Sequence, residues 1–382
     1  MKRFGIIALL PILALLGGCN AVVLNPSGDV AWQQRDLVII STILMLLIII
    51  PVMVLTAVFA WHYRQSNTSA RYEPDWDHST HLELIIWAAP LLIIICLGAV
   101  TWMATHLLDP FRPISRTAPG QVVTHTTKPL NVDVVALDWK WLFIYPDYGI
   151  ATVNEMAAPT DQPINFRISA SSVMNAFYVP ALAGMVYAMP GMQTQLHAVI
   201  NKPGTYKGFS ANYSGAGFSD MRFDFLGMDS AGFEKWVSDV KASGGGTLGR
   251  AEYLELERPS ESVPVKTYAG VDPNLFNLIV NMCVQPGKMC MHEMAAIDAK
   301  GGLGLAGVYN VLPLEYDKYA RRGSDPVVKR SYVASVCTTS APMGMDVRAA
   351  DATPTHSTPL VGAGLPKPVS LFQSFAQKPS NS

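Results

Sequence analysis

The sequence is poor in charged side chains, which make up 15% of its 382 residues. Its 28 Lys and Arg are balanced by 29 Asp and Glu, so the net charge is only -1. Without a basic excess, nucleic acid is excluded as a partner, and nothing steers the chain toward an anionic membrane surface or an acidic substrate. The hydrophobic content of 50% instead favours a membrane protein with a sizeable soluble part, and the length leaves room for two domains.

Cysteine is also scarce, and its positions are scattered. This excludes a small fold held together by a framework of disulfides. Each cysteine must therefore be interpreted from its own surroundings. The five are Cys19, Cys96, Cys283, Cys290 and Cys337.

The N-terminus has the pattern of a secretory signal, which we assign to residues 1–18. Lys2 and Arg3 precede an apolar stretch, and Leu16-Gly17-Gly18-Cys19 closes it with small residues. This ending resembles the bacterial lipobox, in which the cysteine becomes lipid-linked, so Cys19 is the predicted lipidation site. The alternative is an ordinary signal peptide with a chance cysteine. Either way, the mature chain starts outside the cytoplasmic membrane with a linker over residues 19–36, in an oxidising compartment.

Two long apolar runs predict a transmembrane hairpin over residues 37–107, with helices at 37–61 and 84–106. At ~1.5 Å per residue the first run spans about 37 Å and the second at least about 31 Å, enough to cross the hydrocarbon. Neither run has a polar face, so neither could remain in water as a surface helix.

The orientation of this hairpin follows from the signal sequence. The positive-inside rule does not decide it, because arginines flank both ends of both helices. An exported Cys19 sends the first helix inward, places residues 62–83 in the cytoplasm and leaves everything after about residue 107 outside.

Short alternating runs separated by Pro, Gly and Asn follow the hairpin and are typical of strands. Their number and spacing predict an antiparallel β-sandwich over residues 108–230. We expect helical arms in the C-terminal arm at 231–295, and an extension at 296–382 that is largely disordered after about 320 because it has too little apolar surface to order itself. The predicted strands are 132–143, 163–169, 192–200, 205–213 and 221–226.

Five motifs accompany this arrangement of signal, hairpin and sandwich. The whole resembles subunit II of the bacterial heme–copper oxidases, whose periplasmic domain is a cupredoxin-like sandwich. The last motif resembles an arm found in the quinol-oxidising branch of that family. The motifs are Asp138–Pro146, Ser171–Pro180, Tyr187–Met192, Ser210–Gly215 and Pro264–Phe276.

The resemblance locates the positions at which cytochrome c oxidases hold a dicopper centre with cysteines, histidines, a glutamate and a methionine. Only the methionine is kept here. Hydroxyls, amides and a phenyl ring have neither the charge nor the softness to hold copper, so the sequence predicts that this metal site is lost and that Met221 is a core residue. The aligned positions are Asn175, Ser210, Asn212, Ser214, Phe218 and Met221.

Loss of this centre implies, by the same resemblance, a terminal ubiquinol oxidase that couples quinol oxidation and reduction of oxygen to water with proton pumping. Heme, copper and ubiquinol are then expected in subunit I, the main partner, with subunits III and IV in the same complex, and cytochrome c is not a partner. This chain would support subunit I structurally from the inner membrane. Two alternatives are an electron-transfer subunit with a rearranged copper site and a free-standing metal-handling lipoprotein.

Glu83 is the candidate proton-entry residue. A glutamate at this place in the family lies near the mouth of a proton-uptake pathway into subunit I. The plain alternative is an acid in the first helical turn, stabilised by the helix dipole by ~0.3–1 kcal/mol.

A sulfur-rich segment lies in the C-terminal arm, and three interpretations of it stay open. Cys283 and Cys290 could form a disulfide, remain thiols, or bind Cu(I) together with His292. The neighbouring methionines that could contribute are Met282, Met289, Met291 and Met294. Trp139 and Trp141, in the first motif, are interpreted as packing residues because no copper is expected behind them.

Overall fold

A computed structural model describes residues 21–71, 73, 75–124, 127–302, 311–313 and 331–333. These residues all fall in the unit Met1–Val336. The predicted signal peptide, Cys19, Cys337 and most of the predicted C-terminal extension lie outside the described residues.

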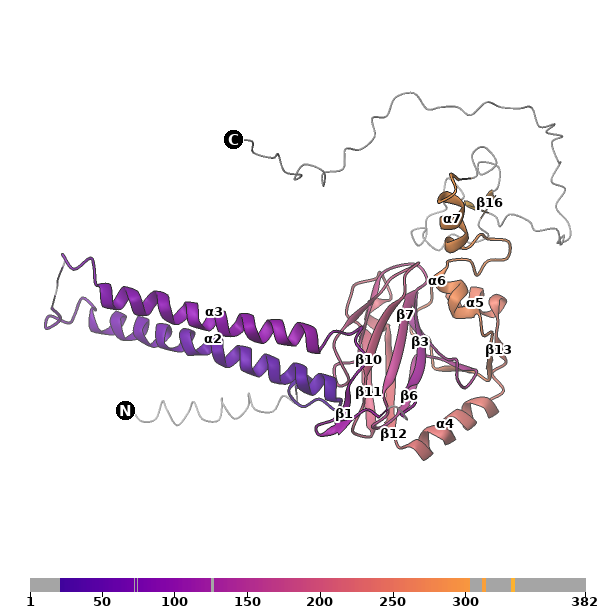
Figure 1. The fold of residues 1–382 in the computed structure, drawn as a ribbon, viewed down its shortest axis with the longest axis horizontal. Coiled ribbons are helices and arrows are strands. Elements are labelled where there is room, and N and C mark those ends of the chain that lie inside the picture. Colours follow the sequence, from indigo (N-terminus) through magenta and orange to yellow (C-terminus); the bar gives the residue numbers. More distant parts are fainter. Residues whose placement is uncertain are drawn as a thin grey trace, which may run out of the picture. The chain divides into compact units, whose positions relative to one another are not determined.

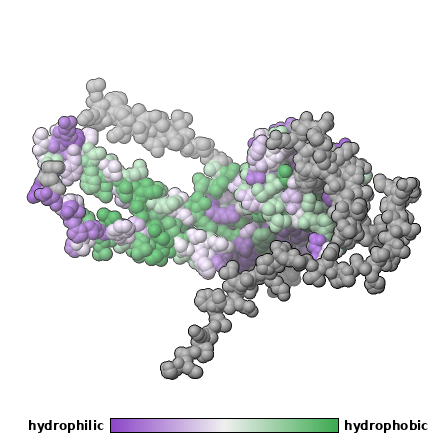
Figure 2. All heavy atoms as spheres, turned by 90° about the horizontal axis from the view of Figure 1, so that it is seen from above, coloured by the Kyte–Doolittle hydropathy of each residue, from purple (hydrophilic) through white to green (hydrophobic). Residues whose placement is uncertain are grey.

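Two apolar helices, α2 (Asp29–His62) and α3 (Thr80–Leu107), pack side by side, and both are long and apolar enough to cross a membrane (Figure 1). Figure 2 shows hydrophobic residues along the pair and hydrophilic ones at the loop that joins them. The first helix begins at Asp29 rather than Leu37, because its first turn is buried against the sandwich, where Asp29 accepts a hydrogen bond from Arg116 at 2.9 Å. The second begins at Thr80 rather than 84. A short 3-10 helix, η1 (Val22–Leu24), precedes them.

The soluble domain is a sandwich of two sheets. The larger has the order β10-β7-β3-β4-β5-β14 and the smaller β6-β12-β11-β8-β9. The larger sheet consists of β3 (Leu130–Leu137), β4 (Lys140–Tyr145), β5 (Ile150–Val153), β7 (Ile164–Ala170), β10 (Thr194–Ala198) and β14 (Lys266–Tyr268). The smaller consists of β6 (Glu155–Pro159), β8 (Asn175–Tyr178), β9 (Val186–Ala188), β11 (Gly204–Ser210) and β12 (Arg222–Met228).

The sequence had suggested a sandwich with only antiparallel strand pairs, but two pairs in the structure are parallel. Strand β3 pairs parallel with β7, and β12 pairs parallel with β6. The chain passes from one sheet to the other between β5 and β6 and again between β6 and β7, so strands distant in sequence become neighbours and some of them run in the same direction.

The predicted strand 132–143 is in fact a hairpin. Leu137 pairs with Lys140 across a two-residue turn, and Trp139 in that turn has a φ of 64°. A left-handed conformation is common for glycine and rare for a bulky residue. Asp138 is a common turn residue, but the bulky Trp139 beside it gives no sign of a left-handed turn, so the pattern of side chains was interpreted as one continuous strand.

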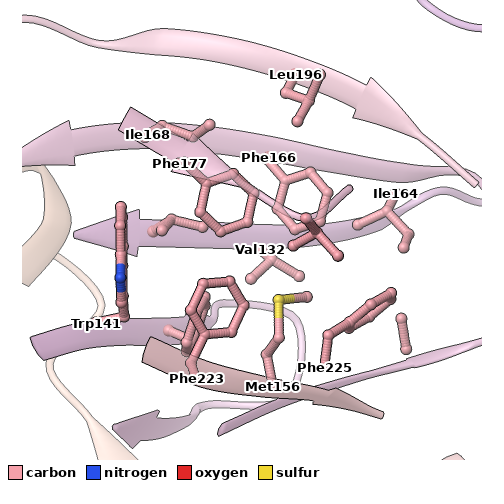
Figure 3. Packing of buried hydrophobic residues seen from close by; sticks show 14 of the residues in the cluster. Val132, Trp141, Met156, Ile164, Phe166, Ile168, Phe177, Leu196, Phe223 and Phe225 are labelled. Carbon is pink, nitrogen blue, oxygen red and sulfur yellow. The ribbon is translucent and has the colours of Figure 1, made fainter. Parts of the chain in front are cut away.

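The main core lies between the two sheets and is rich in aromatic rings (Figure 3). Phe177 stacks on Phe223 with ring centroids 5.5 Å apart and an interplanar angle of 7°, and Trp141 meets Phe177 edge-on at 5.5 Å. Each such pair contributes about 0.5–1.5 kcal/mol beyond the burial of its area. Trp141 is fully buried and Trp139 nearly so, which confirms both as packing residues.

Residues 248–284 of the C-terminal arm form a further layer on the outer face of the larger sheet, whereas Phe233, Val237 and Val240 at the start of the arm belong to the main core. Leu275 and Phe276 pack there against Val135, Leu142 and Val153 in a second core. Strand β14, which the sequence analysis did not predict, extends the sheet by pairing with β5. The arm contains α4 (Ser230–Ala242), β13 (Thr247–Leu248), α5 (Arg250–Glu257), β15 (Gly270–Val271), α6 (Leu275–Val280) and α7 (Met291–Asp298).

Four short strands and a turn of helix complete the described structure. Strands β1 and β2 form a small hairpin just after the membrane helices, and β16 pairs with β17 beyond the arm. The helical turn η2 lies in the loop before β12. These elements are β1 (Arg116–Ala118), β2 (Gln121–Val122), η2 (Phe218–Asp220), β16 (Val311–Pro313) and β17 (Ser331–Val333).

Candidate functional site at the former copper positions

The aligned copper positions lie at one end of the smaller sheet. Asn175 is the first residue of β8, Ser210 is the last residue of β11, and Met221 immediately precedes β12. Strand pairing of β11 with both β8 and β12 brings these three residues together. We call the segments 171–175 and 210–221 the ligand loops.

A hydrogen bond between Asn175 and Ser210 lies at the centre of the ligand loops. The Ser210 hydroxyl donates to Oδ1 of Asn175 at 3.0 Å, with the carbonyl of Asn212 as a second acceptor at 3.1 Å, and it accepts from the backbone N–H of Ala176 at 3.3 Å. Asn175 and Ser210 are 1% and 3% exposed. Because a buried polar group without a partner costs free energy, this mutual pairing is what allows both residues to be buried.

Ser214 and Met221 form a second contact, a weak hydrogen bond to sulfur, beside the pair of Asn175 and Ser210. The Ser214 hydroxyl lies 3.9 Å from Sδ of Met221, within the range of a hydrogen bond to sulfur. Met221 is 1% exposed and belongs to the core cluster between the sheets. As predicted, it is a core residue, although it stands just before β12 rather than within it.

The two remaining aligned positions, Asn212 and Phe218, contact other residues. The Asn212 side chain donates to the backbone carbonyl of Met174 at 3.1 Å. Phe218 meets the ring of Tyr213 edge-on at 5.5 Å. The structure thus brings four of the six positions together and uses the other two to shape the loop surface.

Trp139 closes the ligand loops from the side of β3 and β4. Its indole Nε1 donates to the carbonyl of Ser214 at 3.0 Å. Gly217 lies so close to the ring that an added Cβ would stand 2.6 Å from it. The left-handed turn at Trp139 therefore has a packing role, since it lays the indole over the loop.

Lys140, next to Trp139, is a buried cation that sequence reasoning missed. Its Nζ donates to the carbonyl of Arg258 at 2.7 Å and to the hydroxyl of Ser260 at 2.6 Å, which ties the sandwich to the C-terminal arm. Burial is the main cause that lowers its pKa to about 8, and it outweighs the opposing charge of Asp138. Its place between two buried tryptophans was the only signal in the sequence.

The ligand loops can therefore hold one another, but they offer little to a metal ion. The side chains at the six aligned positions supply two carboxamides, two hydroxyls, a phenyl ring and a thioether, none of which is charged. A dicopper centre of the oxidase type needs bridging thiolates and imidazoles, which are charged or strongly basic donors. The donor set does not fit such a centre.

Family comparisons match both parts of the soluble region. Residues 148–224 match the periplasmic domain of cytochrome c oxidase subunit II. Residues 241–287 match the COX aromatic rich motif, which covers much of the C-terminal arm.

Comparison with whole proteins identifies the family more narrowly than these two domain matches do. The chain is 50% identical over 280 residues to cytochrome bo(3) ubiquinol oxidase subunit 2 of Pseudomonas putida, covering 73% of this chain and 86% of the relative. This chain belongs to the ubiquinol oxidase subunit II family. It is also 50% identical over 266 residues to ubiquinol oxidase subunit 2 of Acetobacter aceti, covering 70% and 84% of the two chains.

Among solved structures, the chain is similar to the periplasmic domain of cytochrome oxidase subunit II of Bradyrhizobium japonicum. It is 22% identical, covers 30% of this chain and 94% of that chain, and has a TM-score of 0.29.

Glu83 lies in the first turn of α3 at the loop end of the membrane hairpin. Its carboxylate is 2.7 Å from Nδ1 of His78, and the two side chains are 51% and 62% exposed. An exposed carboxylate beside an imidazole can exchange protons with water and with its neighbour. This geometry is compatible with both interpretations of Glu83, the helix-dipole acid and the proton-entry group.

The sulfur-rich segment of the arm contains a disulfide between Cys283 and Cys290. Both sulfurs are therefore unavailable as thiolates, which removes the basis for a rearranged copper site built on these cysteines and His292. Among the described cysteines, Cys96 in α3 is free.

Proposed function

We propose that this chain is the subunit II of a terminal ubiquinol oxidase that contains no dicopper centre and passes no electrons. Quinol oxidation and oxygen reduction then take place in subunit I, which holds the heme groups, the copper and the ubiquinol. This chain contributes a folded periplasmic support and a two-helix membrane anchor for subunit I. Proton pumping is a property of the assembled complex.

The observation that carries this proposal is the hydrogen bond between Asn175 and Ser210. Two side chains that satisfy each other in a buried site leave no electron-rich donor for a metal. Without a metal there, an electron from cytochrome c has no acceptor in this domain. The names of the relatives, ubiquinol oxidase subunit 2, support the same conclusion.

The proposal extends to location and partners. The hairpin spans the bacterial inner membrane, the sandwich lies in the periplasm, and Cys19 carries a lipid. Subunit I is the main contact, and subunits III and IV belong to the same complex. Lipid attachment is tested by mass spectrometry of the mature N-terminus, where a Cys19→Ser variant should lack the diacylglycerol mass.

The assembled complex, purified through a tag on this chain, gives the decisive test. Oxygen uptake is measured with ubiquinol and, separately, with reduced cytochrome c as the electron donor. We expect uptake with the quinol and none above background with cytochrome c. Uptake driven by cytochrome c at a comparable rate would contradict the proposal, as would failure of a heme-bearing subunit to co-purify.

A variant with the missing ligands restored is the positive control for metal analysis. After loading with copper, the near-infrared absorption of a mixed-valence dicopper centre should appear in this variant and not in the wild-type complex. Such absorption in the wild type would overturn the proposal. The substitutions are Asn175→His, Ser210→Cys, Asn212→Glu, Ser214→Cys and Phe218→His.

We also propose that Glu83 assists proton entry. The Glu83→Gln variant should assemble with normal heme content but turn over more slowly with quinol. A matched control is Glu73→Gln, which removes a carboxylate of the same loop that pairs with Arg71 at 2.6 Å. Equal rates in wild type and Glu83→Gln would leave Glu83 with only the helix-dipole role.

A further inference from the structure

Two methionine sulfurs meet over a glycine outside the ligand loops. A Cβ placed on Gly191, in the turn between β9 and β10, would lie 2.8 Å from Sδ of Met291 and 3.2 Å from Sδ of Met282. Both sulfurs therefore approach the same point, which a side chain at residue 191 would otherwise fill. Met282 is half-buried and Met291 is 38% exposed, so the point can be reached from solvent.

Met282 occupies a backbone position that normally belongs to glycine. Helix α6 ends in a Schellman motif, in which the N–H of Cys283 donates to the carbonyl of Leu278 at 2.9 Å and that of Met282 to Ile279 at 3.0 Å. The residue in the left-handed position of this motif is Met282, with a φ of 54°. A side chain there strains the backbone where glycine would not, so the thioether at this position comes at a cost to stability.

The segments that carry the two methionines are clamped together. Cys283 follows Met282, Cys290 precedes Met291, and the disulfide joins the two cysteines. The backbone N–H of Met291 donates to the carbonyl of Asn281 at 3.0 Å. The side chain of Asn281 also contacts Nδ1 of His292 at 3.0 Å. The backbone positions that carry the two thioethers are thereby fixed before any ligand arrives, which lowers the entropic cost of binding.

We propose that Met282 and Met291 form a binding site for a soft monovalent metal ion, Cu(I) in the cell. Thioether sulfur is a soft, uncharged ligand that selects Cu(I) over harder ions. The site is separate from the lost dicopper centre and transfers no electrons. The disulfide contributes by positioning the two sulfurs rather than by coordination.

The test is a titration of the full chain in detergent with Ag(I), which has the charge and softness of Cu(I) and needs no reductant that would open the disulfide. The buffer is free of chloride. Cys96→Ser and Cys337→Ser form the background, so that free thiols do not compete. Binding is followed by calorimetry and by the NMR signals of methionine methyl groups labelled with ¹³C.

We expect a tight equivalent of Ag(I) that shifts two methyl signals. Met282→Gly and Met291→Leu should each weaken binding at least tenfold, and Cys283→Ser with Cys290→Ser should weaken it as well. Met282→Gly suits the left-handed position, so it should retain the folding of the arm while it loses the metal. Met228→Leu, which replaces a methionine at the end of β12, is the matched control and should leave binding unchanged.

Equal affinity in wild type, Met282→Gly and Met291→Leu would overturn the proposal and mark the bound ion as adventitious. The absence of any shifted methyl signal would do the same. Because neither variant touches the ligand loops, quinol oxidase activity reports separately on the proposed function.

Discussion

The aromatic core between the sheets and the ligand loops beside it are neighbours with opposite chemistry. Phe177 and Phe223 stack in the core, whereas Asn175, two positions before Phe177, pairs with Ser210 in the ligand loops. Met221 joins the two regions, because it is buried in the core cluster and its sulfur lies 3.9 Å from the Ser214 hydroxyl. The core consists of large apolar rings that interlock. The loops consist of small polar groups that satisfy one another.

This contrast shows where the stability of the domain resides. The core buries apolar surface without any metal, so the sandwich can fold around it whatever stands at the ligand positions. The loops only have to avoid unsatisfied buried groups, which the pairing of Asn175 with Ser210 achieves. A cupredoxin-like sandwich can therefore lose its copper ligands and keep its shape.

The largest expected effect lies in the core. Phe177→Ala removes the ring that touches Phe223, Trp141 and Phe166, and should lower the free energy of unfolding by about 3–5 kcal/mol. Thermal unfolding of the complete chain, followed by tryptophan fluorescence, measures it. If Phe177→Ala lowered the free energy of unfolding no more than a substitution in the ligand loops does, the core would not be the main source of the domain's stability.

The next largest effect is on the free energy of unfolding at Lys140, and this effect depends on pH. Its pKa is lowered from 10.5 to about 8 in the folded chain, so between these values the unfolded chain binds more protons. Stability should therefore rise by up to about 3 kcal/mol as the pH increases from 8 to 10.5. Tyrosines titrate in the same range, so the quantity to compare is the difference between wild type and Lys140→Met. A difference that does not change with pH would show that the amine is not buried as a cation.

Ser210→Ala should have a smaller effect. It leaves Oδ1 of the buried Asn175 without its donor, at a cost of about 1–2 kcal/mol. The double variant Ser210→Ala with Asn175→Leu removes both polar groups and should recover part of the loss. If the single variant were fully stable, the hydrogen bond would not be what holds the loops together.

Met221→Leu should have the smallest effect, less than about 1.5 kcal/mol, because the two side chains have similar volume and polarity. Quinol oxidase activity and heme content should stay unchanged. A loss of activity without a loss of stability would assign Met221 a role beyond packing.

Several features were predictable because they follow from local pattern. The two helices follow from uncharged runs too apolar for water, and α4 lies in the region where helical arms were predicted. Met221 was correctly placed in the core. The hairpin turn was missed because a tryptophan, Trp139, occupies its left-handed position, and strand β14 was missed because it pairs with β5, far away in the sequence.

The sequence by itself determined which chemical groups are present: apolar runs long enough to span a membrane, and hydroxyls and amides where thiolates and imidazoles would be needed. Side-chain identity and local hydropathy suffice for those conclusions. Only the tertiary structure decided that Lys140 is buried under the arm and that Met282 and Met291 meet over Gly191. Burial and convergence depend on which distant segments pack together, and periodicity along the chain carries no information about that.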